Sequence, residues 1–406
     1  MDPGAARVAE RRAAVPAYLL GFVLIGLVLS VAGPGLSHLR DRMGTDDAGI
    51  AWVFVGGSLG YIVGSTFAGR LLDHGQGHRW WAGAMLVSVG SILLIAAAPD
   101  LPLLVLAFVV SGLASGLGDV SGNTLVMWSR PQGAGALLNA LHLCFAIGAL
   151  AAPVVVNRSI HWFDSLWGVA IPASVLALVG ATILLRNPSP RRTRMDVVER
   201  SRAGGARSMQ VVLISLFFFA YVGFETGFVG WIHTYVEQIG YGDAVTATGV
   251  VTIFWLGFTL GRVAAIGIAR RVSPGWIVAS SMAVSVAASV LFAVFPDGGL
   301  MLWVVTFVLA LSIAPQYASM MAFAESHLAL SGRNTATMVA ASGVGGLLMP
   351  WLLGQLFDSI GPASLPPVMV VMAVLTSIVA LAVRRALLRG GGGQRPPVTS
   401  MNDAVT

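Results

Sequence analysis

The sequence has no lysine, one cysteine and few charges of either sign: 10 % of its 406 residues are charged, whereas 56 % are hydrophobic. Soluble globular domains carry roughly 25 % charged residues, so this composition excludes an ordinary water-soluble fold. Because Cys144 has no second cysteine to pair with, an intramolecular disulfide framework is also excluded. Without lysine, chemistry through a lysine Schiff base is excluded as well.

Twelve long apolar stretches account for the hydrophobic composition. A helix needs ~20 apolar residues to cross the ~30 Å hydrocarbon core of a bilayer, and a helix satisfies its own backbone polar groups there. The predicted spans are residues 15–36, 48–72, 80–98, 101–128, 134–157, 166–186, 209–236, 244–270, 274–295, 299–327, 333–357 and 363–388. We therefore expect an all-α membrane protein with 12 transmembrane helices.

All 24 basic residues are arginines, and their distribution predicts how the chain lies in the membrane. With both termini on one side, 20 arginines fall on that side, three (Arg40, Arg42 and Arg158) fall on the other, and Arg262 lies within a span. The positive-inside rule then predicts cytoplasmic termini and a multi-pass protein of the inner (plasma) membrane. A basic surface for nucleic acid is the poorer reading, because no soluble module with interleaved aromatic residues accompanies the arginines.

The chain divides into two halves that resemble each other. We predict a six-helix bundle over residues 1–186, an Arg-rich cytoplasmic linker over 187–208, a second bundle over 209–388 and a disordered cytoplasmic tail over 389–406. The segment 148–153 parallels 345–350, and 163–165 parallels 357–359. Parallel six-helix repeats are the architecture of major facilitator transporters, so the repeats predict a major facilitator fold with two pseudo-symmetric bundles.

The loop after the second span resembles the major facilitator loop motif, Gly-x-x-x-Asp-Arg/Lys-x-Gly-Arg-Arg/Lys. The resemblance implies that Asp73 lies against a helix N-terminus of the opposite half and forms a conformational lock with Arg70 or Arg130. This sequence places His74 in the basic position and has one extra residue afterwards. The alternative is a solvated turn between two spans.

Two acids lie within predicted spans, Asp119 in the fourth and Glu225 in the seventh. A charge at this depth costs about 2.5–3.5 kcal/mol on insertion scales, so it needs a partner or a water-filled cavity. Burial disfavours a charged carboxylate, which can then take up a proton near neutral pH. We expect Asp119 or Glu225 to bind the coupling ion, a proton or sodium; the alternative is a buried structural ion pair.

Polar and aromatic side chains at similar depth are the predicted substrate ligands. Hydrogen-bonding groups come from both halves, as a site at a repeat interface requires, and aromatic rings suit the C–H faces of sugars. The predicted substrate-binding residues are Asn123, Asn139, His142, Trp231, Trp255 and Gln316. The alternatives are interhelical hydrogen bonds for the amides, an interfacial aromatic belt for Trp231 and helix packing for Trp255.

Enzymatic signatures are weak in this chain. The segment 116–119 matches the Gly-x-Gly-Asp pattern of intramembrane aspartyl proteases, but no second aspartate in a span completes the pair. No phosphate loop, zinc-ligand cluster or dinucleotide fingerprint is found, because the glycine-rich segment 343–346 lies in a span rather than after a strand. We expect no enzyme and no cofactor apart from the coupling proton or sodium.

Five segments resemble the sodium-dependent glucose transporter-like proteins and the wider fucose:proton symporter family with its bacterial glucose/mannose members. The resemblance is carried by residues 33–35, 55–65, 119–125, 138–142 and 225–235. It implies secondary active uptake of a hexose by alternating access, driven by protons or sodium, with Asp119 matching the acid of the fourth span. We expect a monomer in the lipid bilayer with a small sugar-like substrate.

Two other functions stay open at this point. A drug or metabolite exporter of the same fold would carry Gly-x-x-x-Gly-Pro in its fifth span, but here alanine replaces the second glycine in the segment 148–153. A non-transporting membrane receptor would show no counterflow of any solute.

Overall fold

The computed structural model describes residues 13–73, 75–129, 134–190, 208–269, 271–296, 299–328 and 332–390, and within these ranges the chain is helical with short turns. Most of the predicted tail and most of the predicted linker lie outside these ranges, but residues 389 and 390, predicted as the start of a disordered tail, form the end of a helix. Eleven helices are long and apolar enough to cross a membrane, and a bent pair supplies a twelfth crossing. The prediction of 12 transmembrane helices is confirmed.

The first six crossings form the N-terminal bundle. Their helices are α2 (Val15–Leu29), α3 (Ala32–Met43), α4 (Asp47–Ile50), α5 (Trp52–Asp73), α6 (Gly77–Ala97), α7 (Leu101–Ser129), α8 (Ala134–Phe163), η1 (Leu166–Val169) and α9 (Ala170–Arg186). Helices α2 and α3 meet at an angle of 40° and form one crossing. Pro34 explains part of this bend, because it has no N–H to donate to the carbonyl group one turn earlier.

The last six crossings form the C-terminal bundle. Their helices are α11 (Ser208–Gln238), α12 (Ala244–Ile268), α13 (Pro274–Val294), α14 (Gly299–Ile313), α15 (Gln316–Glu325), α16 (Gly332–Ser359), η2 (Pro362–Ser364) and α17 (Leu365–Gly390). A short break at Ala314 and Pro315 separates α14 from α15 within one crossing.

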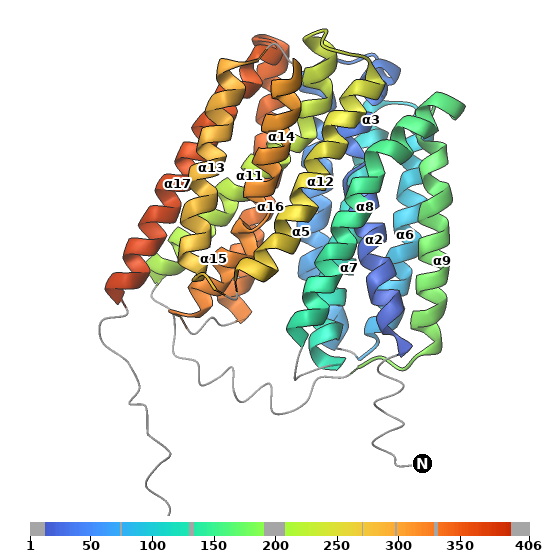
Figure 1. Cartoon of the computed structure of the whole chain (residues 1–406). Helices are drawn as coiled ribbons and strands as arrows, with labels where there is room; N and C mark the ends of the chain where they lie inside the picture. Colours follow the sequence, from blue (N-terminus) through green and yellow to red (C-terminus); the bar gives the residue numbers. More distant parts are fainter. Residues whose placement is uncertain are drawn as a thin grey trace, which may run out of the picture.

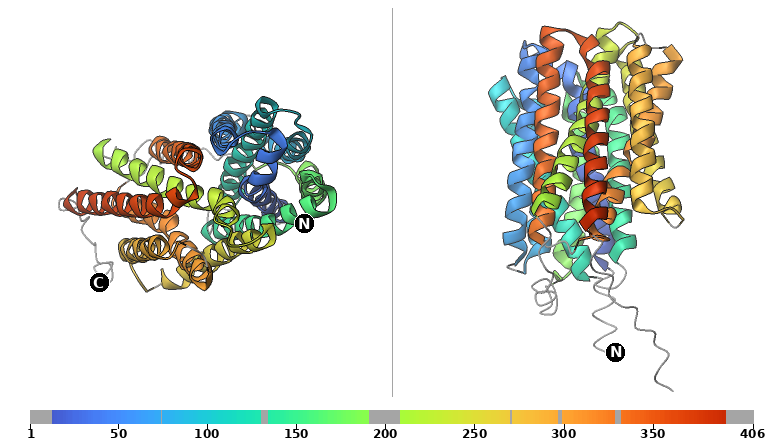
Figure 2. Two further views of the ribbon diagram at one scale, coloured as in Figure 1. Left: turned by 90° about the horizontal axis from the view of Figure 1, so that it is seen from above. Right: turned by 90° about the vertical axis from the view of Figure 1, so that its left-hand side faces the viewer.

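The two bundles stand side by side, and α8 and α5 of the first face α12 and α16 of the second (Figure 1). The view from above shows the two groups of helices as separate lobes (Figure 2). The start of α2, the end of α9, the start of α11 and the end of α17 all lie at the lower end of Figure 1, which we call the linker side. The opposite end, where α3 and α4 lie, is the far side.

Glycines allow helices within each bundle to touch along their backbones. A Cβ atom added at Gly60 of α5 would lie 2.0 Å from the carbonyl oxygen of Val109 in α7, so only glycine fits there. Small residues at such positions let membrane helices approach closely and pack well. This close approach fixes the rotation of α5 against α7.

The same device appears at matching places in both bundles. An added Cβ at Gly148 of α8 would lie 2.0 Å from the carbonyl oxygen of Val23 in α2. An added Cβ at Gly345 of α16 would lie 2.0 Å from the carbonyl oxygen of Phe219 in α11. Because Gly148 and Gly345 head the two parallel sequence segments, their equivalent packing supports the pseudo-symmetry predicted from the repeat.

A polar contact region joins the bundles at the far side, and we call it the far-side seam. Its hub is Asp47 of α4, whose carboxylate accepts hydrogen bonds from Arg40 at 2.9 Å and from Gln238 of α11 at 2.7 Å. Ser37 of α3 donates to Glu237 of α11, and the side chain of Gln355 donates to the carbonyl of Ala48 at 3.2 Å. The far side is therefore closed by contacts between the two bundles.

Candidate functional site

The first acid, Asp119, lies midway along α7 and is partly exposed. The hydroxyl of Tyr61 in α5 donates to its Oδ2 at 2.5 Å, and Nδ2 of Asn123 donates to its Oδ1 at 3.0 Å. Both carboxylate oxygens therefore accept a hydrogen bond. Tyr61 is held in place by the glycine packing of α5 on α7, because a Cβ at Gly116 would lie 2.3 Å from the Tyr61 carbonyl oxygen.

The second acid, Glu225, lies on α11 and is also partly exposed. Tyr221 lies one turn earlier on the same helix, and its buried hydroxyl has no hydrogen-bond partner, while Arg262 on α12 is within electrostatic range of the Glu225 carboxylate. No nitrogen of Arg262 comes within 4.0 Å of a Glu225 oxygen among the ion pairs of the described residues. The two charges thus influence each other without forming a closed salt bridge.

Arg262 is the cationic side chain within electrostatic range of Glu225. Its guanidinium carbon lies 4.7 Å from the centre of the Phe258 ring, a cation–π contact worth about 0.5–2 kcal/mol. Its Nε atom is buried and has no hydrogen-bond partner. This donor is therefore available to a ligand or a water molecule.

Tyr317 connects the two acids. It lies on α15, just after the break between α14 and α15, with its ring centre 4.6 Å from that of Phe218. It is within electrostatic range of Asp119, Glu225 and Arg262 at the same time. Acids from the two bundles therefore face one shared region, although they are separated by 106 positions in the sequence.

We call this region the central site. Its members come from both bundles and are ionisable or hydrogen-bonding side chains: Tyr61, Asp119, Asn123, Tyr221, Glu225, Arg262 and Tyr317. All of them except Tyr221 are partly exposed, although they lie within membrane-spanning helices. Partial exposure at a bundle interface indicates a water-accessible space rather than a dry packed core. Neither acid is locked in a closed ion pair.

Two predicted ligands lie next to the central site. His142 of α8 is partly exposed, contacts the Phe22 ring edge-on at 5.8 Å between ring centres, and lies within electrostatic range of Arg262. Trp255 packs edge-on against Phe145 of α8 at 6.4 Å and is almost fully buried. Trp255 therefore belongs to the contact between the bundles, two turns from Arg262.

Gln316 and Trp231 are placed differently, in packed interhelical contacts. Gln316 is 0 % exposed, and its Nε2 donates to Ser285 of α13 at 2.9 Å and to the Ser312 carbonyl at 3.0 Å, whereas its buried Oε1 has no hydrogen-bond partner. Trp231 is also 0 % exposed, and its indole N–H donates to the Pro350 carbonyl at 2.8 Å. The structure does not bring either residue to the central site. The side chain of Asn139 lies outside the described residues.

The predicted conformational lock falls on residues that are mostly outside the described part. The side chain of Asp73 and the whole of Arg130 are not described. Arg70 is exposed near the end of α5, with its guanidinium carbon 5.9 Å from the Phe67 ring centre. The lock therefore stays a prediction.

Tyr61, Tyr221 and Tyr317 were not predicted from the sequence. A tyrosine in a span is not unusual in itself, and the sequence does not show whether the rotation of its helix turns it towards an acid on another helix. Of the three, only Tyr221 could have been predicted from sequence spacing, because it precedes Glu225 by four residues and so shares its helix face.

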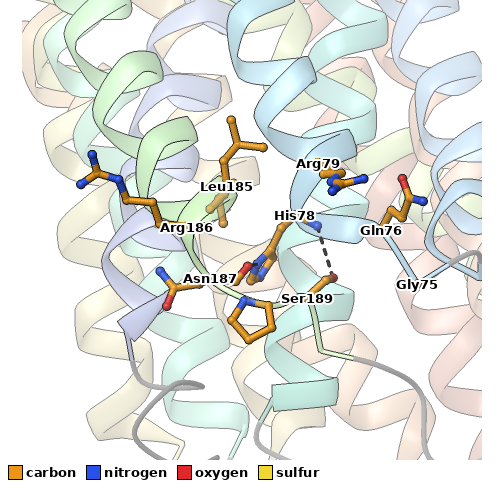
Figure 3. A pocket seen from close by; sticks show the side chains of 10 residues that line it. Gly75, Gln76, His78, Arg79, Leu185, Arg186, Asn187 and Ser189 are labelled. Atoms are coloured by element: carbon orange, nitrogen blue, oxygen red, sulfur yellow. Dashed lines mark hydrogen bonds between the residues drawn. The ribbon is translucent and has the colours of Figure 1, made fainter.

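A separate pocket lies on the linker side of the N-terminal bundle (Figure 3). It is lined by the start of α6 and the end of α9, including Gln76, Arg79 and Asn187. The His78 ring bonds to the Tyr18 hydroxyl at 2.8 Å and the Asn187 carbonyl at 2.9 Å, and its backbone N–H donates to Ser189 at 3.3 Å. These bonds tie α6 to α2 and to the end of α9. Within the described residues, no three metal-ligating side chains gather anywhere.

Two six-helix bundles with a shared ionisable site between them define a transporter of the major facilitator type. Residues 18–350 match the Major Facilitator Superfamily, and the chain belongs to this superfamily.

Relatives and solved structures extend this assignment. The chain is 25 % identical over 358 residues to "Sodium-dependent glucose transporter 1" of Xenopus laevis, which covers 81 % of this chain and 73 % of that one. It is 24 % identical over 371 residues to the human protein of the same name, with 82 % and 72 % covered. The E. coli fucose:proton symporter has a similar structure, with a TM-score of 0.64, 16 % identity and coverage of 91 % and 98 %. An inward-open E. coli xylose transporter gives a TM-score of 0.73 at 13 % identity, covering 92 % and 96 %.

Proposed function

We propose that the protein is a secondary active transporter that carries a hexose across the membrane by alternating access, coupled to a proton or sodium gradient. The observation that carries this proposal is the central site, where carboxylates and hydroxyls from both bundles meet in a partly exposed region. Hydroxyl, amide and carboxylate groups at similar depth suit a substrate with many hydroxyl groups. The relatives named as glucose transporters favour the same substrate class.

Alternating access requires that the two bundles separate at one side while they touch at the other. The far-side seam supplies contacts that can hold the closed state, with Asp47 accepting hydrogen bonds from Arg40 and Gln238. Opening of the far side would break the bond between Asp47 and Gln238, because it joins the two bundles, whereas the bond between Arg40 and Asp47 lies within the N-terminal bundle. The predicted lock at Asp73 would serve the opposite side in the other state.

The excess of arginines on the linker side supports a cytoplasmic location of that side. We therefore place the far side outside and the protein in the inner (plasma) membrane. All members of the central site come from one chain, so the site requires no second subunit. We therefore propose a monomer. The superfamily consists of transporters, and we infer no catalytic reaction for this chain.

Reconstituted proteoliposomes test the proposal. The purified protein should exchange labelled hexose by counterflow without any ion gradient, and an imposed pH or sodium gradient should drive accumulation above equilibrium. A hexose panel, with each gradient imposed alone, identifies the sugar and the ion. Absence of counterflow for every hexose would refute sugar transport, and counterflow of lipophilic cations instead would favour an exporter.

A further inference from the structure

The two acids of the central site have different surroundings, and we infer that they have different tasks. We propose that Arg262 holds Glu225 as a charge-balanced carboxylate that binds sugar hydroxyls, and that Asp119 alone exchanges the coupling cation. This division rests on the proposed sugar transport. It gives Glu225 and Arg262 a task distinct from that of Asp119, the acid that the resemblance matches to the fourth span.

Asp119 has no cationic partner among the described residues. The groups that face it are Tyr61 from α5, Asn123 from its own helix and Tyr317 from α15, and all three are uncharged. Hydrogen bonds from hydroxyl and amide groups stabilise a carboxylate only in part at membrane depth, where an unpaired charge is costly. Binding of one monovalent cation would remove that charge.

Glu225 has a cation within electrostatic range in this structure. The groups that face it are Tyr221 from its own helix, Arg262 from α12 and Tyr317 from α15. Arg262 stays positively charged, because a guanidinium group does not lose its proton in proteins. Uptake of a cation by Glu225 would therefore leave Arg262 as an unbalanced positive charge in the membrane.

A charge count of the central site gives the stoichiometry. Two carboxylates and one guanidinium sum to a formal charge of −1, with His142 neutral. One cation at Asp119 brings the total to zero, and a neutral sugar leaves it there. A second cation, at Glu225, would bring the total to +1. Since a net charge is expensive to move through the hydrocarbon region, the site favours one cation per sugar.

The position of Arg262 also explains how Glu225 can serve the sugar. The buried Nε of Arg262 has no hydrogen-bond partner, and no closed salt bridge consumes the Glu225 oxygens. A donor and an acceptor on facing helices are thus both available to one sugar hydroxyl or to two neighbouring ones. The buried Nε would gain its missing acceptor when the sugar binds.

The test uses the full chain in proteoliposomes and four variants, Asp119→Asn, Glu225→Gln, Arg262→Gln and the double variant Glu225→Gln/Arg262→Gln. Asp358→Asn is the control, because Asp358 is an exposed acid at the far-side end of α16. Each protein is assayed for counterflow, for gradient-driven accumulation and for the charge moved per labelled sugar. Thermal unfolding of each purified variant reports on folding.

We expect Asp119→Asn to keep counterflow and lose accumulation. Glu225→Gln leaves Arg262 unbalanced, so one cation would bring the site to +1 and accumulation should fall; its KM should also rise roughly ten- to hundredfold, because a hydrogen bond to a charged group is lost. Arg262→Gln leaves Glu225 unbalanced, so the charge moved per sugar should rise from one towards two. The double variant restores a site charge of −1, so it should accumulate sugar with one charge per sugar while its KM stays raised.

Several results would overturn the division of tasks. They are accumulation by Asp119→Asn, loss of counterflow by folded Asp119→Asn, loss of accumulation by the folded double variant at saturating sugar, and an unchanged charge ratio in Arg262→Gln. The wild-type counterflow separates this inference from the proposed function. If the wild type exchanges hexose and the variants behave otherwise, only the division of tasks fails.

Discussion

The far-side seam and the central site are both built from polar groups of the two bundles, but they satisfy those groups in different ways. In the seam the partners belong to the protein: the carboxylate of Asp47 is bonded to Arg40 and Gln238. In the central site, Arg262 keeps a buried Nε without an acceptor, and Glu225 has no closed salt bridge.

The difference in hydrogen-bond pairing indicates the function of each region. A region whose polar groups are paired with one another is stable as it stands, so it can act as a closed gate. A region with unpaired donors and partly exposed carboxylates reaches its full set of bonds only with a ligand. Polar side chains of similar types thus close the far side in the seam and bind the ligand in the central site.

The largest effect is expected from a variant that separates α5 from α7, because these helices carry Tyr61 and Asp119 of the central site. In Gly60→Leu the new side chain would meet the Val109 carbonyl, since even a Cβ would lie 2.0 Å from its oxygen. We expect loss of folded protein, measured as monodisperse yield and thermal unfolding. Gly83→Leu is the matched control, because nothing lies within 4 Å of a Cβ at that position. Equal yields from the two variants would contradict the packing argument.

Removal of the hub of the seam should open the far side without damage to the central site. Asp47→Ala loses the hydrogen bond from Gln238 to a charged carboxylate, which crosses between the bundles and is worth about 1.5–3 kcal/mol, roughly a ten- to 150-fold shift of the closed–open equilibrium. Spin-label distances between the far-side ends of α4 and α16 should lengthen. An unchanged distance distribution in folded Asp47→Ala would mean that the seam does not hold the closed state.

A smaller change concerns the orientation of Asp119. Tyr61→Phe keeps the ring but removes the hydroxyl that donates to Oδ2 at 2.5 Å. We expect gradient-driven uptake to fall several-fold, while counterflow remains, because the carboxylate keeps its bond to Asn123. Uptake rates identical to the wild type would show that this hydroxyl does not position Asp119.

The smallest effect on transport is expected at Gln316, which bonds to Ser285 and Ser312 in the packed interior of the C-terminal bundle. Gln316→Leu should cost about 1 kcal/mol of stability, the magnitude of an interhelical hydrogen bond in a membrane. Its KM for sugar should stay within twofold of the wild type. A tenfold rise in KM at an unchanged unfolding temperature would instead make Gln316 a substrate ligand, as the sequence predicts.

The sequence predicted the fold because span length and arginine placement are local properties. Twelve apolar stretches and the repeated segments 148–153 and 345–350 were enough for the superfamily architecture. Asp119 and Glu225 stood out for a similar reason, since an acid in an apolar stretch needs no structure to be noticed.

The composition of the site was harder to predict because it depends on the rotation of each helix. Gln316 and Trp231 have the right depth, but their helices turn them towards Ser285 and the Pro350 carbonyl. Tyr61 and Tyr317 come close to the acids only through the glycine packing of α5 on α7 and the break before α15. Neither property can be read from hydropathy.

The most direct test of the central site is substrate protection of a single thiol. In a Cys144→Ala background, Asn123→Cys places the thiol one turn from Asp119, and a small membrane-impermeant thiol reagent is applied from each side in turn. We predict that saturating hexose strongly slows the labelling of Asn123→Cys. A cysteine at the exposed position in Asp358→Cys should be labelled equally with and without sugar. Labelling of Asn123→Cys that is unaffected by hexose, or absent from both sides, would contradict a water-accessible sugar site between the bundles.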